Sequence, residues 1–327
     1  MYALTYLSTY CPKTGIDVNI EQLLRDLFKT TIERNLARDI SGYLVFENGY
    51  FLQTLEGEES AVADIYASIS RDVRHRDLTV LHHGEIAQRY YRDFGISVSS
   101  RRGSGLEIGN VVAHIKARAM HAPNTLAHRY FRMLLTPGRR RLQTSAADRF
   151  ADTRPKDPTR VALSSSQAFW LYPTFNHIAT LYGEAPQSSN IADVFDAIQE
   201  PVALEYVDIN VTPANVTRVL GVNDGLLTSQ AAQPTLSELD LIVILARARE
   251  PDEYFSFVGH LLSYAVNDVQ KPLIMLICPD PDAEFILAIK EAAELQGFQL
   301  QVHPGAPKNG DEVWAHMRSW LMDCRKA

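Results

Sequence analysis

Two apolar runs joined by a tight-turn dipeptide constrain the fold of this chain more than any other feature of its sequence. The runs are SGYLVF and YFLQTLEG, and the segment between them contains Asn48-Gly49. An Asn-Gly pair favours the positive φ angles of a two-residue hairpin turn, and runs of aromatic and aliphatic residues favour strands. The segment therefore predicts an antiparallel β-hairpin.

The elements around this hairpin predict a single sheet with helices on one face. We expect a strand at residues 2–8, a helix from about Asn19 to Asn35, and a second helix from about Glu59 to Arg71. DLTVLHHGEI and FGISVS supply two further strands. The order βαββαββ indicates an α+β ferredoxin-like domain, with a ligand slot between the two helices and over the sheet.

Three polar residues can be brought to that slot. Gln53 lies in the middle of an apolar strand, Tyr6 lies in the N-terminal strand YALTYLS, and Asn35 ends the first helix. One phenol and two carboxamides supply both donors and acceptors. Around an apolar slot they can bind the edge of a flat heteroaromatic ring, which indicates a cofactor.

The first hundred residues resemble the BLUF family, the blue-light sensors that hold FAD. The resemblance is carried by YALTYLS, RNLARDISGYL, FLQTLEGE, SRDVRH and YYRDFGI, which occur in register along nearly the whole N-terminal unit. Each of these residues alone has an ordinary structural explanation. Their occurrence together, with the spacing from Asn35 to Gln53 and on to Arg74-His75, makes the resemblance specific.

The resemblance implies a set of FAD-binding residues. Tyr6 matches the tyrosine that gives an electron and a proton on excitation, and Gln53 matches the glutamine that bridges this tyrosine and the N5/O4 edge of the flavin. In the family, light changes the orientation or tautomer of that amide, and the absorption moves to the red. Asn35 matches the residue that bonds the pyrimidine edge of the ring. The other implied pocket residues are Arg34, near the phosphates, the pair Arg74 and His75, the apolar walls Ile40 and Phe51, and the strand-five residues Phe94 and Ile96.

Three positions depart from the family pattern. Phe94 and Ile96 stand where the family often has Trp and Met, and Ser68 stands where a basic side chain is common. Phe94 offers no indole donor and Ile96 offers no thioether. The departures put the family's usual signalling residues in doubt.

The C-terminal half has a different pattern. The expected domains are a flavin-binding domain at residues 1–100, connecting helices at 101–136, a polar linker at 137–160, and an output domain at 161–327. Apolar runs such as VALEYVDI, LDLIVILA and PLIMLIC alternate there with helical patterns, including FSFVGHLLSYAV. This alternation predicts an α/β doubly wound domain.

The expected output domain contains no recognisable catalytic motif. The loop from Ser164 to Gln167 falls where a phosphate-binding loop would be, but it has neither Lys nor Gly. YVDIN, with Asp208, faintly resembles an acidic motif of small GTPases, although a strand ending in Asp is common in any α/β domain. The histidines and cysteines lack metal-ligand spacing, so no metal is expected.

Length, charge and cysteine content limit the number of domains, the possible partners and the cellular compartment. The chain has 327 residues, enough for two ordinary domains, and its formal net charge of -7 excludes general nucleic-acid affinity. No stretch is long and apolar enough to span a membrane, and no signal peptide is recognised. The three distant cysteines are expected to be reduced thiols, which predicts a cytoplasmic protein.

The sequence therefore predicts a cytoplasmic flavin photoreceptor rather than an enzyme. It would signal through the C-terminal domain, a partner protein or a homo-oligomer. Two alternatives stay open: a light-regulated enzyme whose C-terminal domain binds nucleotides, and a scaffold that has lost its flavin.

Overall fold

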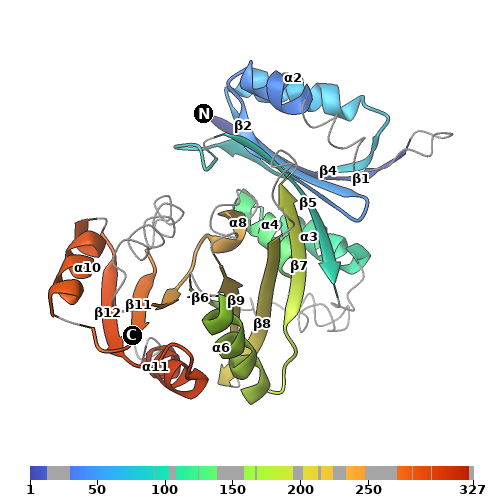
Figure 1. Cartoon of the computed structure of the whole chain (residues 1–327). Coiled ribbons are helices and arrows are strands. Elements are labelled where there is room, and N and C mark those ends of the chain that lie inside the picture. The colour runs from blue at the N-terminus through green and yellow to red at the C-terminus, as the bar shows by residue number, and fades with distance from the viewer. Residues whose placement is uncertain are drawn as a thin grey trace. The chain divides into compact units, whose positions relative to one another are not determined.

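The structure is a computed structural model that divides the chain into two compact units (Figure 1). It describes residues 1–12, 30–91, 93–102, 108–123, 125–137, 158–165, 168–193, 202–212, 215–223, 233–246, 271–281, 283–295 and 297–323. Unit 1 comprises Met1–Leu142 and Ser189–Val202, and unit 2 comprises Gln143–Ser188 and Ala203–Ala327. The helix expected at FSFVGHLLSYAV, most of the expected linker, and the first helix up to residue 29 lie outside the described residues.

Unit 1 is built on a sheet whose strand order is β7-β5-β2-β3-β1-β4. Its elements are β1 (Tyr2–Tyr10), β2 (Ser41–Glu47), β3 (Tyr50–Gly57), α2 (Glu59–Ser70), β4 (His75–Glu85), β5 (Phe94–Arg102), α3 (Ile108–His121), α4 (Ala127–Leu135) and the part of β7 (Gln187–Asp193) from Ser189 onward. Residues 30–36 are helical. The predicted βαββαββ order is confirmed for the described elements, and β7 is an additional strand.

The predicted hairpin forms with the expected turn. Asn48 and Gly49 both have positive φ, at 45° and 86°, and β2 pairs antiparallel with β3 from Glu47 opposite Tyr50. Because φ is positive at both turn residues, the turn has the geometry that Asn-Gly favours. The turn also fixes the register of the two strands.

One row of residues crosses the sheet on the face covered by α2. Tyr6 of β1 is opposite Gln53 of β3, Gln53 is opposite Leu44 of β2, and Leu44 is opposite Ile96 of β5. Directly opposed residues of neighbouring strands point to the same face. Tyr6, Leu44 and Ile96 belong to a buried hydrophobic cluster that also contains Val62 of α2, and Gln53 is the buried polar residue in the row.

The helices α3 and α4 lie against the other face of the sheet, which we call the back face (Figure 1). The rings of Tyr43 in β2 and Phe131 in α4 are 5.3 Å apart in an edge-to-face contact. Tyr130 donates from its hydroxyl to the backbone oxygen of Leu81 at 3.1 Å. Leu81 lies at a register shift between β1 and the edge strand β4. The connecting helices expected within residues 101–136 are confirmed, and they contact the sheet through residues such as Tyr130 and Phe131.

Replacing Gly42 in β2 by alanine is expected to destabilise unit 1. Gly42 has φ of +151°, and a Cβ there would lie 2.1 Å from the backbone oxygen of Thr54. Strained backbone and overpacking each cost on the order of 1–3 kcal/mol. Gly84 in β4 is the matched control, because its φ is +155° but no atom lies within 4 Å of a Cβ there.

The measurement is thermal unfolding by circular dichroism with tryptophan fluorescence alongside. The tryptophans Trp170, Trp314 and Trp320 are all in unit 2, so a dichroism transition without a fluorescence change reports unit 1. Gly42→Ala should lower that transition much further than Gly84→Ala. Equal effects would show that the contact with Thr54 is not what requires glycine.

Unit 2 contains a mixed sheet with the strand order β12-β11-β10-β6-β9-β8. Its elements are β6 (Thr159–Ser164), α6 (Ala168–Leu181), β8 (Val202–Thr212), β9 (Asn215–Val222), α8 (Gln233–Leu236), β10 (Leu241–Leu245), β11 (Leu273–Cys278), α10 (Ala283–Leu295), β12 (Gln299–Pro304) and α11 (Gly310–Asp323). Neighbouring strands from β12 to β9 are parallel, whereas β8 and β9 are antiparallel.

The hairpin of β8 and β9 departs from the expected alternation of strands and helices. The segment VALEYVDI forms β8 as predicted, but the chain then turns back into β9 rather than entering a helix. The apolar runs LDLIVILA and PLIMLIC form β10 and β11, as the sequence predicts, and the helices α6, α10 and α11 alternate with strands in this part of the chain. The doubly wound arrangement of the whole unit stays a prediction.

Candidate functional site

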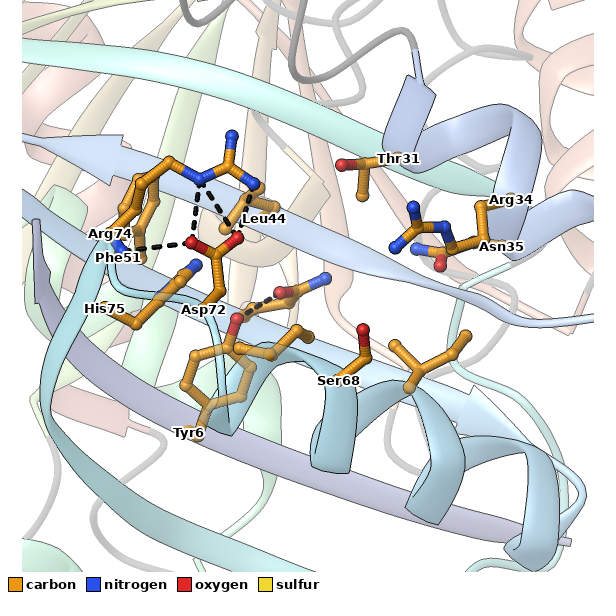
Figure 2. A pocket seen from close by; sticks show the side chains of 13 residues that line it. Tyr6, Thr31, Arg34, Asn35, Leu44, Phe51, Ser68, Asp72, Arg74 and His75 are labelled. Carbon is orange, nitrogen blue, oxygen red and sulfur yellow. Dashed lines mark hydrogen bonds and ion pairs between the residues drawn. The ribbon is translucent and has the colours of Figure 1, made fainter. Parts of the chain in front are cut away.

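A pocket lies over the sheet of unit 1, between α2 and the helical segment at residues 30–36 (Figure 2). It is lined by Tyr6, Thr31, Arg34, Asn35, Leu44, Phe51, Gln53, Ile65, Ser68, Ile69, Asp72, Arg74 and His75. The strands supply its floor, and the two helices supply its walls. This is the slot that the order of elements predicts.

Tyr6 and Gln53 form a buried hydrogen bond on the floor of the pocket. They face each other across β1 and β3, and the Tyr6 hydroxyl donates to Gln53 Oε1 (Figure 2). Burial, with smaller contributions from Tyr66 and Asp72, raises the pKa of Tyr6 well above its ordinary value. The phenol therefore keeps its proton, and the bond fixes which end of the Gln53 amide faces the tyrosine.

Two amide groups at the pocket have donors without partners. Gln53 Nε2 and Asn35 Nδ2 are buried and have no hydrogen-bond partner among the described residues. A buried donor without an acceptor costs about 1–3 kcal/mol, so such groups call for a partner. The pocket therefore suits a ligand with acceptor atoms at two places along a ring edge.

His75 and Phe51 form one end of the pocket, beside Tyr6. The His75 ring lies 4.8 Å from the Phe51 ring and 6.1 Å from the Tyr6 ring, measured between centroids. His75 Nδ1 and Ser8 Oγ are 2.8 Å apart and hydrogen bonded. Burial lowers the pKa of His75, which favours a neutral ring at this end of the pocket.

Arg74 is held by an acidic residue that sequence reasoning missed. Its Nε lies 2.9 Å from each carboxylate oxygen of Asp72, and its Nη2 also bonds Asp72 (Figure 2). Hydrogen bonding from Arg74 lowers the pKa of Asp72 to about 2. Asp72 lies inside the segment SRDVRH that carries the family resemblance, but only Arg74 and His75 of that segment were expected to be site residues.

The remaining expected site residues fall into two groups. Arg34 lines the pocket and is exposed, whereas Ile40, Phe94 and Ile96 do not line it and are buried in the cluster on the same face. Thr31, Leu44, Ile65 and Ile69 line the pocket but were not singled out as site residues. Leu44 could have been found from the hairpin register, and Thr31 from its place one helical turn before Asn35.

The sheet, the helices and the two amide donors without partners define an α+β ligand-binding domain. Residues 1–97 match the family model described as BLUF, sensors of blue-light using FAD. Residues 1–97 are thus a BLUF domain, and members of this family bind FAD for blue-light sensing.

Curated relatives match the chain over a short part of their length. The photoactivated adenylate cyclase subunit beta of Euglena gracilis is 36% identical over 89 residues, which is 27% of this chain and 10% of that protein. The subunit beta-like protein FB of the same organism is 39% identical over 70 residues, 21% of this chain and 8% of that protein. Among solved structures, the BlsA ground state is 22% identical, with a TM-score of 0.28, over 38% of this chain and 74% of that one.

The resemblance of unit 2 to small GTPases gains no support from these matches. Asp208, which suggested it, has its carboxylate bound by Arg218, with Nε to Oδ1 at 2.8 Å and Nη2 to Oδ2 at 2.9 Å. Both residues are buried in the β8–β9 hairpin. The acidic residue that suggested a GTPase motif therefore lies inside β8 and is half of an ion pair. None of the described helices is long and apolar enough to cross a membrane.

Proposed function

We propose that the pocket of unit 1 binds the ring of FAD and that the protein senses blue light through Tyr6 and Gln53. The observation that carries this proposal is the buried bond between them, with Gln53 Nε2 and Asn35 Nδ2 left as donors on the pocket side. A flavin ring carries carbonyl and imine acceptors along its edge. The donor set therefore fits this cofactor, and the bound FAD would supply blue-light absorption and an electron acceptor.

The other pocket residues have supporting roles in this proposal. Phe51 and Leu44 offer apolar surface to the ring, while Ile40, Phe94 and Ile96 pack behind the wall rather than against the ligand. Arg34 is an exposed cation at the rim, suited to the phosphates. Arg74 is paired with Asp72, so it positions the end of the pocket beside His75.

The chemistry of Gln53 allows a switch between two hydrogen-bond patterns. A carboxamide has one acceptor end and one donor end, so reversing it exchanges the groups that face Tyr6 and the ligand. Each bond contributes roughly 1 kcal/mol net, which is enough to bias a two-state element nearby. A carboxylate at this position would only accept, and could not make both patterns.

We further propose that the response passes to unit 2 or to a partner protein. Unit 2 has a core of its own around Leu163, Phe175 and Met317, which supports its treatment as a separate output module. The photoactivated adenylate cyclases named above join light sensing to an enzyme, but the match covers a tenth of their length. No catalytic role is assigned to unit 2.

An absorption spectrum of the purified protein tests the proposal. After reconstitution with FAD, we expect a flavin band in the blue and a reversible red shift of that band on illumination. A protein that takes up no FAD would contradict the proposal and favour a flavin-free scaffold. A flavin band that does not shift on illumination would support FAD binding but contradict the proposed light response.

A further inference from the structure

A buried carboxylate on the back face of the sheet has no part in the proposed light response. Glu56 follows Gln53 by three residues along β3, so its side chain points to the opposite face. Only 2% of its surface is exposed. Its Oε2 accepts hydrogen bonds from the backbone N–H groups of Tyr90 and Tyr91, at 2.9 and 3.0 Å.

The segment held by Glu56 is also packed against α4. The Tyr90 ring is stacked on His128 of α4, with centroids 4.8 Å apart and planes 22° apart. The Tyr91 ring is stacked on Tyr43 at 5.7 Å and meets Phe131 of α4 at 6.3 Å. Glu56 therefore fastens backbone groups whose own side chains contact α4.

The groups around Glu56 offset only part of the rise in its pKa that burial causes. Arg89 precedes the fastened segment, but its guanidinium is hydrogen bonded to Asp39, with Nη1 to Oδ1 at 3.0 Å and Nη2 to Oδ2 at 2.7 Å. Ser41 of β2 and the rings of Tyr43, Tyr90 and Tyr91 bring no charge at neutral pH, and His128 faces Tyr90 from α4. Burial raises the pKa of Glu56 to about 7, against the opposing effects of the two backbone N–H groups, Arg89 and Ser41.

We propose that Glu56 is a proton-operated latch, which fastens Tyr90 and Tyr91, and through their rings α4, to the back face of the sheet. When the segment is released, water reaches the carboxylate and its pKa returns toward the ordinary value of 4.5. The fastened state therefore binds the proton more tightly than the released state. By linkage, the latch is favoured below the raised pKa and is loosened as the pH rises toward it.

The pKa values of Glu56 in the fastened and released states determine how strongly pH changes the ratio of released to fastened segment. Between pH 6 and pH 8 the ratio of released to fastened segment should rise about tenfold, and it should level off above that range. Asp39 gives the contrasting case. It is exposed, and its hydrogen bond with Arg89 lowers its pKa, so it stays charged throughout this range.

Hydrogen exchange of the full chain in the dark tests the latch. After correction for intrinsic exchange rates, protection of the Tyr90 and Tyr91 amides should fall about tenfold from pH 6 to pH 8. Glu56→Gln should remove this pH dependence, because its amide is neutral at every pH. Asp39→Asn should keep it. The measurement uses no light, so its outcome is independent of whether the flavin response exists.

Two results would overturn the latch. One is protection that does not depend on pH in the unmodified protein. The other is a pH dependence that survives Glu56→Gln and disappears in His128→Phe, which would assign the effect to the histidine. Should Glu56→Gln fail to fold, a carbon-13 titration of the glutamate carboxyls in the unmodified protein decides. A buried carboxyl titrating near 7 is expected, and its absence would contradict the proposal.

Discussion

Gln53→Leu is expected to abolish the light-induced red shift completely while leaving the flavin band in place. Leucine approximates the volume of glutamine but offers neither a donor nor an acceptor. It removes both the acceptor of the Tyr6 hydroxyl and the unpaired Nε2 donor on the pocket side. The remaining donor at Asn35 and the apolar walls should still hold the ring. The measurement is a light-minus-dark difference spectrum at equal flavin occupancy.

Two companion variants make this result specific. Tyr6→Phe keeps the ring but removes the hydroxyl that donates to Gln53, so it should also lose the shift. Ile69→Val trims a pocket-lining residue of α2 that offers no polar group, so it should keep the shift. A red shift that persists in Gln53→Leu would remove Gln53 from the mechanism. Loss of the shift in all three variants would indicate a general disturbance of the pocket.

The pairing of β2 with β3 could be predicted residue by residue, because a short turn between them sets their register. The turn at Asn48-Gly49 sets Glu47 opposite Tyr50, and counting outward sets Leu44 opposite Gln53. The contact between Gln53 and Tyr6 could not be predicted from the turn, because it joins strands that are distant in the chain. Only the family resemblance supplied it before the structure placed Tyr6 opposite Gln53.

The polar partners of buried and half-buried charged residues could not be predicted from sequence. Glu56 is satisfied by backbone groups 34 and 35 residues away, and backbone N–H groups leave no trace in the sequence. Asp72 holds Arg74 across a turn whose conformation no dipeptide rule specifies. The sequence reports where a charged residue is, whereas its burial and its partner depend on how the strands and loops meet.

Arg218→Met is expected to lower the free energy of unfolding of unit 2 by about 3–5 kcal/mol, because it leaves a buried carboxylate without its guanidinium. Asp208 and Arg218 are directly opposed in the β8–β9 hairpin, and both are less than a tenth exposed. Burial alone would lower the pKa of Arg218, but Asp208 outweighs it and raises that pKa. The Tyr206 ring, 5.3 Å from the guanidinium carbon, adds a cation–π contact.

Urea unfolding followed by tryptophan fluorescence measures this loss, since the fluorescence reports unit 2 alone. The double variant Asp208→Leu with Arg218→Met replaces both charges by apolar groups, and it should recover most of the lost stability. Asp311→Asn weakens the exposed pair with His177 and should change stability by at most about 1 kcal/mol. If the double variant is as unstable as Arg218→Met, the ion pair holds the hairpin in a way that apolar packing cannot replace. Recovery in the double variant would instead show that the single variant is destabilised by its unpaired carboxylate, as expected for a structural ion pair.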